Sequence, residues 1–142
     1  MIQRWSFSMQ LLLIIAISLH ILAGVFWAGS TFALARTGGL GGESLFRLQR
    51  AAMGITVIAG AYLWSQLHAG DFGTSERVLA FGVVCAIIAG IAQGAISGRA
   101  LRGLRKAEND KTLLWSRFAL GQRIGAVLLA ITIICMGAAR YI

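Results

Sequence analysis

Four long stretches of this chain contain almost no charged residues, and this feature limits the fold more than any other. Residues 9–35 carry no Asp, Glu, Lys or Arg, although His20 lies near their middle. Lipid offers no partner to backbone N–H and C=O groups, so a segment that crosses the hydrocarbon core forms a helix of about 20 apolar residues. Hydrophobic residues make up 58% of the chain, more than a soluble domain of this size carries. The sequence predicts an all-α integral membrane protein, a four-helix bundle in a single domain (1–142) with spans at about 9–35, 51–67, 78–98 and 118–139.

Basic residues gather in two of the three connections, and this asymmetry predicts the topology. The second connection has Arg77 as its one basic residue, whereas the first holds Arg36, Arg47 and Arg50 and the third holds Arg99, Arg102, Arg105, Lys106, Lys111 and Arg117. By the positive-inside rule, the first and third connections face the cytoplasm and both termini lie outside. The net charge of +8 then contacts the anionic headgroups of the lipid bilayer, and no nucleic-acid partner is expected. We expect a multi-pass protein of the bacterial inner (cytoplasmic) membrane.

The composition of the connections predicts their form. Four glycines make 37–42 a flexible break, and 43–50 is expected to form a short interfacial helix before the second span. Residues 99–117 contain one glycine and no proline. The third helix is therefore expected to continue into the cytoplasm and to turn near 108–110.

The third span carries small residues four positions apart, at Gly82, Ala86, Gly90, Gly94 and Gly98. Residues at this spacing share one face of a helix, so the face is a shallow groove that allows close approach. One interpretation is helix–helix packing, within the bundle or in an oligomer. The other is that a flat ring such as a porphyrin lies on the groove, with Gly90 and Gly94 as cofactor-binding residues.

His20 is the ionisable residue in the middle of the first span. Ionisable groups at mid-membrane depth are costly and are functional candidates by default. A neutral imidazole there can ligate a metal or donate a hydrogen bond to another helix. Matching depths across the bundle brings Thr56, Ala89, Gln93 and Thr132 toward its level. If His20 is merely structural, Gln93 and Thr132 are its expected hydrogen-bond partners.

Two further residues are candidates for ligand or metal contacts. His68 ends the second span, and its depth differs from that of His20 by about 16 Å under ideal helix geometry. This separation disfavours one haem shared by both histidines. His68 could instead form a weak metal site with Asp71. The alternative is that His68 is an exposed loop residue without a role. Arg123 lies just inside the fourth span, where it either snorkels to the headgroups or contacts a haem propionate.

The first span also resembles a known family. Its Leu-His and Trp-x-Gly pattern is similar to the signature that opens the membrane domain of copper-resistance D-type proteins and HemJ-type protoporphyrinogen oxidases, through Leu19, His20, Trp27, Gly29, Phe32 and Arg36. The resemblance implies a small four-helix membrane bundle with His20 in the place of the family's first-helix histidine. The HemJ branch implies b-type haem on that histidine and electron transfer. The copper-resistance branch implies copper binding or passage.

Two positions depart from the haem-binding branch of that family. Its members carry a Lys near the start of the third helix, where this chain has Arg77. They also carry an Asn-Glu pair before the last helix, where Gly121 and Gln122 stand. The proton-handling groups of protoporphyrinogen oxidation are therefore missing from the matching positions.

The sequence thus favours a small haem b-binding membrane protein in electron transfer, with His20 as axial ligand. If the protein is an enzyme, it is a membrane oxidoreductase. The alternative is a non-catalytic accessory or assembly subunit, packed through the Gly82–Gly98 face against a membrane-protein partner or a second copy. The third hypothesis is a copper-handling protein with His20 and His68 as metal ligands. Its support is thinner because the four methionines are not expected to gather at one depth with a histidine.

Overall fold

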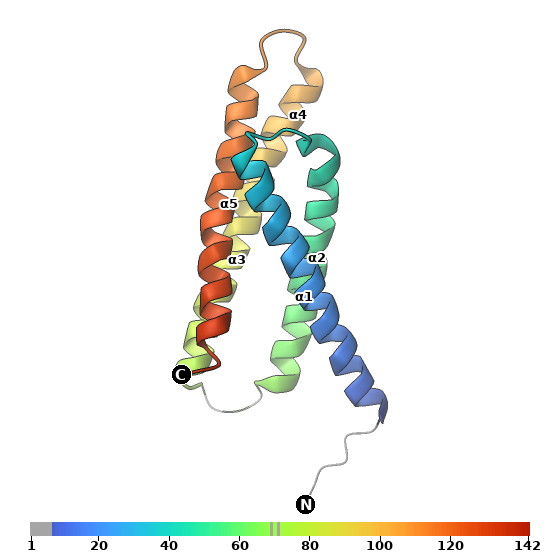
Figure 1. Cartoon of the computed structure of the whole chain (residues 1–142), viewed down its shortest axis with the longest axis vertical. Coiled ribbons are helices and arrows are strands. Elements are labelled where there is room, and N and C mark those ends of the chain that lie inside the picture. The colour runs from blue at the N-terminus through green and yellow to red at the C-terminus, as the bar shows by residue number, and fades with distance from the viewer. Residues whose placement is uncertain (1–6, 69, 71) are drawn as a thin grey trace, which may run out of the picture.

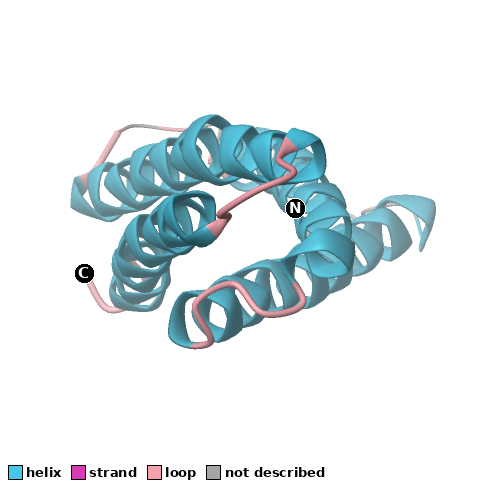
Figure 2. Ribbon diagram, turned by 90° about the horizontal axis from the view of Figure 1, so that it is seen from above, coloured by secondary structure: helices cyan, strands magenta, loops and turns pink. Residues whose placement is uncertain are grey.

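The computed structural model describes residues 7–68, 70 and 72–142, and every regular element in this part of the chain is a helix (Figures 1 and 2). The elements are α1 (Phe7–Arg36), α2 (Gly42–Leu67), α3 (Thr74–Ala92), the π-helical segment η1 (Gln93–Ser97), α4 (Gly98–Lys106) and α5 (Thr112–Ala138). Because α3, η1 and α4 follow one another without a break, they form one long rod. The predicted all-α architecture is confirmed.

The helices form two antiparallel pairs. α1 packs along α2, α3 packs along α5, and the pairs are joined mainly through α1 and α5 (Figure 1). The pairs lie close together at the end that carries the 37–41 and 107–111 connections, and α1 leans away from α5 toward the other end. We call these the basic end and the open end. α1 begins and α5 finishes at the open end.

Three helices in the described part of the chain are long and apolar enough to cross a membrane. They are α1, the α3–η1–α4 rod and α5. Large apolar side chains on α1 remain exposed, Leu22 and Val25 at 69% and 67%, as expected of a surface that faces lipid. α2 is of similar length but is more polar, because Glu43, Arg47 and Gln49 lie in its first turns.

The third connection has the predicted form and the first does not. α4 continues the third helix to Lys106, and a non-helical segment precedes α5, as expected. Residues 43–50, however, are continuous with α2, so the prediction of a separate interfacial helix is wrong. The physical reason is that Phe46 and Gln49 are buried against the other helices, which keeps this segment within the bundle.

The glycine-rich 37–41 connection is a tight turn. Gly38, Gly39 and Gly41 adopt positive φ angles of 66°, 95° and 76°, which non-glycine residues rarely adopt. A Cβ at Gly39 would lie 2.7 Å from the Phe118 ring, so the turn packs directly on α5. The glycines thus allow a turn that packs closely on α5.

Candidate functional site

A layer of buried polar side chains joins all the long helices near the basic end. We call it the polar layer; its members are Trp27 and Thr31 of α1, Gln49 of α2, Gln93 of η1 and Gln122 of α5, each 2% exposed or less. Trp27 Nε1 donates to Gln93 Oε1 at 2.8 Å. Gln93 Nε2 and Gln49 Nε2 donate to Thr31 Oγ1 at 2.9 and 2.7 Å. Gln49 and Gln122 exchange two amide hydrogen bonds of 3.0 and 3.4 Å.

The polar layer uses its hydrogen-bonding groups fully at Thr31. This hydroxyl accepts two hydrogen bonds and donates one to the Trp27 carbonyl oxygen at 2.7 Å, which is its entire capacity. Glycines on α5 make room for the layer, because a Cβ at Gly125 would lie 2.5 Å from Gln93 Nε2. A satisfied buried network fixes the relative positions of helices, so this layer is structural.

An apolar cavity of ≈ 570 Å³ lies on the open-end side of the polar layer, between the two helix pairs. Its walls come from α1, α2, α3 and α5, and all but four of its residues are apolar. The lining residues are His20, Trp27, Thr56, Val57, Gly60, Ala61, Leu63, Trp64, His68, Leu79, Val83, Ala86, Ile87 and Met136. Cavities of about 300–1,000 Å³ with few polar groups are typical of small-molecule sites.

His20 lines this cavity and has a defined orientation. Its Nδ1 lies 2.9 Å from the carbonyl oxygen of Thr56 on α2. A carbonyl oxygen only accepts, so Nδ1 carries a proton, and in the neutral imidazole the lone pair is then on Nε2. Gly60 makes room for the ring, since a Cβ there would lie 2.9 Å from His20 Cε1. Metal-ligating histidines use this same arrangement, with one nitrogen donating to a carbonyl oxygen and the other free for the metal.

The partner of His20 differs from the two predicted residues. Thr56 was correctly expected at its level, but Gln93 bonds Trp27 and Thr31, and Thr132 Oγ1 donates to the Gly82 carbonyl oxygen at 3.0 Å. The expectation that Gln93 and Thr132 are the partners is therefore wrong, because both have nearer acceptors or donors.

His68 and Met136 line the same cavity as His20. The His68 ring stacks on Trp64, with centroids 5.0 Å apart and planes 25° apart, and its Nδ1 is buried without a hydrogen-bond partner among the residues that the structure describes. His20 packs beside Gly60, and His68 follows eight residues later, about 12 Å farther along α2. Asp71, its predicted partner, lies outside the described residues. The sequence did not predict Met136 here, since the methionines were expected at other depths than a histidine.

The small-residue face of the third helix packs within the bundle, and most of it lies away from His20. A Cβ at Gly90 would lie 2.6 Å from Met53 Sδ, one at Gly94 would lie 2.7 Å from Arg50 Nη1, and one at Gly82 would lie 2.9 Å from Cys135 Cβ. The packing interpretation is thus confirmed for a single chain. Neither Gly90 nor Gly94 lines the cavity with His20; of this face, only Ala86 does.

Arg123 is also separate from the cavity. Its side chain is exposed on α5, and it is not among the residues that line the space around His20. This position agrees with snorkelling to headgroups and not with contact to a group held by His20.

Residues of the site that sequence reasoning missed are Gly60, Trp64 and Met136. Gly60 had a usable signal, because a glycine in a helical span indicates close approach of another group. Within the described residues, no group of three or more His, Cys, Asp or Glu side chains is arranged to hold a metal ion. The chain matches no protein-family model, no curated protein and no solved structure with which it was compared.

Proposed function

We propose that this chain is a small membrane protein that binds b-type haem in the apolar cavity, with His20 as axial ligand, and acts in electron transfer. The observation that carries the proposal is the orientation of His20. Its Nδ1 donates to the Thr56 carbonyl oxygen at 2.9 Å, and in the neutral imidazole Nε2 is the nitrogen that remains for a metal, on a side chain that lines the cavity.

The cavity has the chemistry that a porphyrin requires. Its volume of ≈ 570 Å³ falls in the range of cofactor sites, and its walls are mostly aliphatic and aromatic. A bound haem would supply reversible one-electron chemistry, and apolar walls would tune its potential. Met136 is a thioether on another wall, and histidine with methionine is a known axial pair. His68, nearer the open end, is available for a propionate.

The membrane arrangement belongs to the same proposal. We infer that α2 also spans the membrane, which makes four spans, since it is similar in length to α1 and α5 and packs antiparallel to α1. The basic end then faces the cytoplasm and both chain ends lie outside, by the positive-inside rule. The proposed location is the bacterial inner membrane.

Copper binding is the second candidate, because two imidazoles and a thioether line one cavity. Thioethers favour Cu(I), and imidazole ligates both oxidation states of copper. An accessory-subunit role through the Gly82–Gly98 face has less support, since side chains of the same chain already pack closely against Gly82 and Gly90.

The test is an absorption spectrum of the protein purified from haem-replete and copper-replete cells, with elemental analysis of the same sample. We expect a Soret band in the wild type, its loss in His20→Ala and its retention in His68→Ala. A colourless wild type that contains copper would favour the second candidate. A colourless and copper-free wild type, or a Soret band unchanged in His20→Ala, would overturn the haem proposal.

A further inference from the structure

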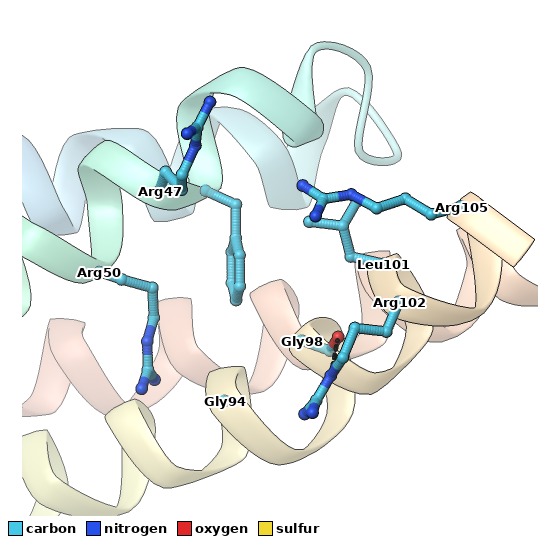
Figure 3. A pocket seen from close by; sticks show the side chains of 8 residues that line it. Arg47, Arg50, Gly94, Gly98, Leu101, Arg102 and Arg105 are labelled. Carbon is cyan, nitrogen blue, oxygen red and sulfur yellow. Dashed lines mark hydrogen bonds between the residues drawn. The ribbon is translucent and has the colours of Figure 1, made fainter.

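A second cavity, of ≈ 290 Å³, lies at the basic end between α2 and α4 and is separate from the His20 cavity (Figure 3). We call it the arginine pocket. Its residues are Phe46, Arg47 and Arg50 of α2, Gly94 of η1, and Gly98, Leu101, Arg102 and Arg105 of α4. Four cationic side chains from two helices therefore surround one small space.

These four arginines have few protein partners. Arg50 Nη1 donates to the Gly90 carbonyl oxygen at 3.2 Å, and Arg102 Nε donates to the Gly98 carbonyl oxygen at 3.3 Å. In the described part of the chain, none of the four forms an ion pair with a carboxylate. Each guanidinium carries five N–H donors, so most of the donors around the pocket are unused. Four positive charges around one pocket repel one another, and an anion bound there would reduce the repulsion.

Arginines from both helices line the pocket, so each helix can contribute donors to an anion bound there. Arg105 extends from α4 toward α2, and Arg50 extends from α2 toward Gly94 (Figure 3). Gly94 permits this approach, because a Cβ there would lie 2.7 Å from Arg50 Nη1. Guanidinium groups bind phosphate oxygens in pairs of parallel hydrogen bonds, so a phosphate suits this geometry better than a monoatomic anion.

The apolar walls of the pocket favour a lipid over a soluble phosphate. Phe46 and Leu101 are buried at 8% and 6% exposure and line the pocket beside Gly98. A free phosphate makes no favourable contact with aromatic and aliphatic walls. The glycerol and the upper acyl chain of a phospholipid do pack favourably against such walls. Basic pockets at the ends of membrane helices bind anionic headgroups in this way.

We propose that the arginine pocket binds the phosphate of an anionic phospholipid and so connects α2 to α4 at the basic end. The inference does not rest on the haem proposal, since the two cavities share no residue.

The test is native mass spectrometry of the full chain in detergent, titrated with phosphatidylglycerol and, separately, with phosphatidylcholine. We expect phosphatidylglycerol to bind the wild type at least about tenfold more tightly, because both lipids carry a phosphate but only phosphatidylglycerol has a net charge. Equal binding of the two lipids would overturn the proposal. So would displacement of phosphatidylglycerol by inorganic phosphate at matched ionic strength, since the site would then take a soluble anion.

A pair of double variants separates the pocket from general attraction to charge. Arg47→Gln with Arg105→Gln removes two pocket arginines, and Arg99→Gln with Arg117→Gln makes the same change in charge at the same end, outside the pocket. We expect the pocket variant to lose about tenfold in phosphatidylglycerol affinity and the control to lose less than about threefold. Equal losses in the two variants would overturn the proposal.

A third variant keeps every charge and fills the space instead. A Cβ at Gly98 would lie at 3.7 Å from the Phe46 ring, an ordinary contact, so Gly98→Leu places a side chain in the pocket without displacing the backbone. Loss of phosphatidylglycerol binding in Gly98→Leu is expected. Unchanged binding in a folded Gly98→Leu protein would contradict binding within the pocket.

Discussion

The two ends of this helix bundle differ in how the helices are held together. At the basic end, the polar layer joins both helix pairs through buried hydrogen bonds, and Phe118 packs edge-on against Phe46 and Trp115 at 5.8 and 5.9 Å. At the open end, His20 bonds Thr56 within the α1–α2 pair, and Ser75 and Thr132 bond Ala139 and Gly82 within the α3–α5 pair. The difference indicates that one end holds the fold and the other provides the space.

This division explains how a short chain keeps a large cavity. An apolar cavity forfeits packing contacts, and that cost must be offset elsewhere in the molecule. The polar layer sits directly above the cavity, and Trp27 belongs to both, with its indole N–H bonded to Gln93 and its ring at the cavity wall. Substitutions in the polar layer are therefore expected to change stability, and substitutions around His20 are expected to change binding.

The largest expected effect is that of Gln93→Leu. This change leaves the buried Trp27 N–H without an acceptor and removes a donor to Thr31. We expect a loss of about 3 kcal/mol in unfolding free energy, from the lost hydrogen bonds and the unsatisfied indole N–H. Reversible unfolding in mixed micelles measures it. Gln10→Leu, at an exposed position on α1, is the control, and an equal loss in both variants would contradict a structural role for the layer.

A smaller and different effect is expected from Gly60→Ala at the open end. The added Cβ lies 2.9 Å from His20 Cε1 and displaces the imidazole from the Thr56 carbonyl oxygen. We expect about a tenfold loss in haem affinity, the range reported for disrupted support of a metal ligand, with unfolding free energy unchanged or slightly increased. Haem titration and the same unfolding assay measure the two quantities.

Gly54→Ala is the matched control for Gly60→Ala. Gly54 lies on the same helix, and a Cβ there meets no atom within 4 Å. We expect this variant to bind haem as the wild type does. Equal haem affinity in Gly60→Ala and Gly54→Ala would mean that the orientation of His20 does not matter for binding.

The contrast between the two ends also explains what the sequence could predict. Apolar length located α1, the third helix and α5, because this signal depends only on local composition. The level of Thr56 beside His20 followed from counting residues along antiparallel helices. Gln49 was assigned to an interfacial segment because Arg47 and Arg50 flank it, and its burial depends on contacts with Thr31 and Gln122 from distant parts of the chain.

The cavity could not be predicted from composition for a related reason. It exists because the helix pairs diverge, and divergence depends on how side chains such as Met53 and Gln93 fill the grooves of glycine faces. The stripe of small residues indicated close approach, which is correct. It did not indicate which side chains of α2 and α5, such as Met53 and Cys135, pack against the face.

The smallest expected effect lies in the turn beyond the basic end. The Thr112 hydroxyl and backbone N–H donate to Asp110 Oδ1 at 2.6 and 2.9 Å, and these bonds hold the pKa of Asp110 below its ordinary value of 3.8. A carboxyl with a lowered pKa in the folded state stabilises the fold above the unfolded-state pKa, and the contribution is lost as the pH falls through the folded-state value.

Because Asp110 is fully exposed, we expect Asp110→Asn to lower the unfolding midpoint only slightly at pH 7, with the difference from wild type vanishing in acid below the ordinary pKa. Glu108→Gln, in the same turn but without these bonds, should show no such convergence, and a difference that persists unchanged into acid would show that the charge of Asp110 is irrelevant to the basic end.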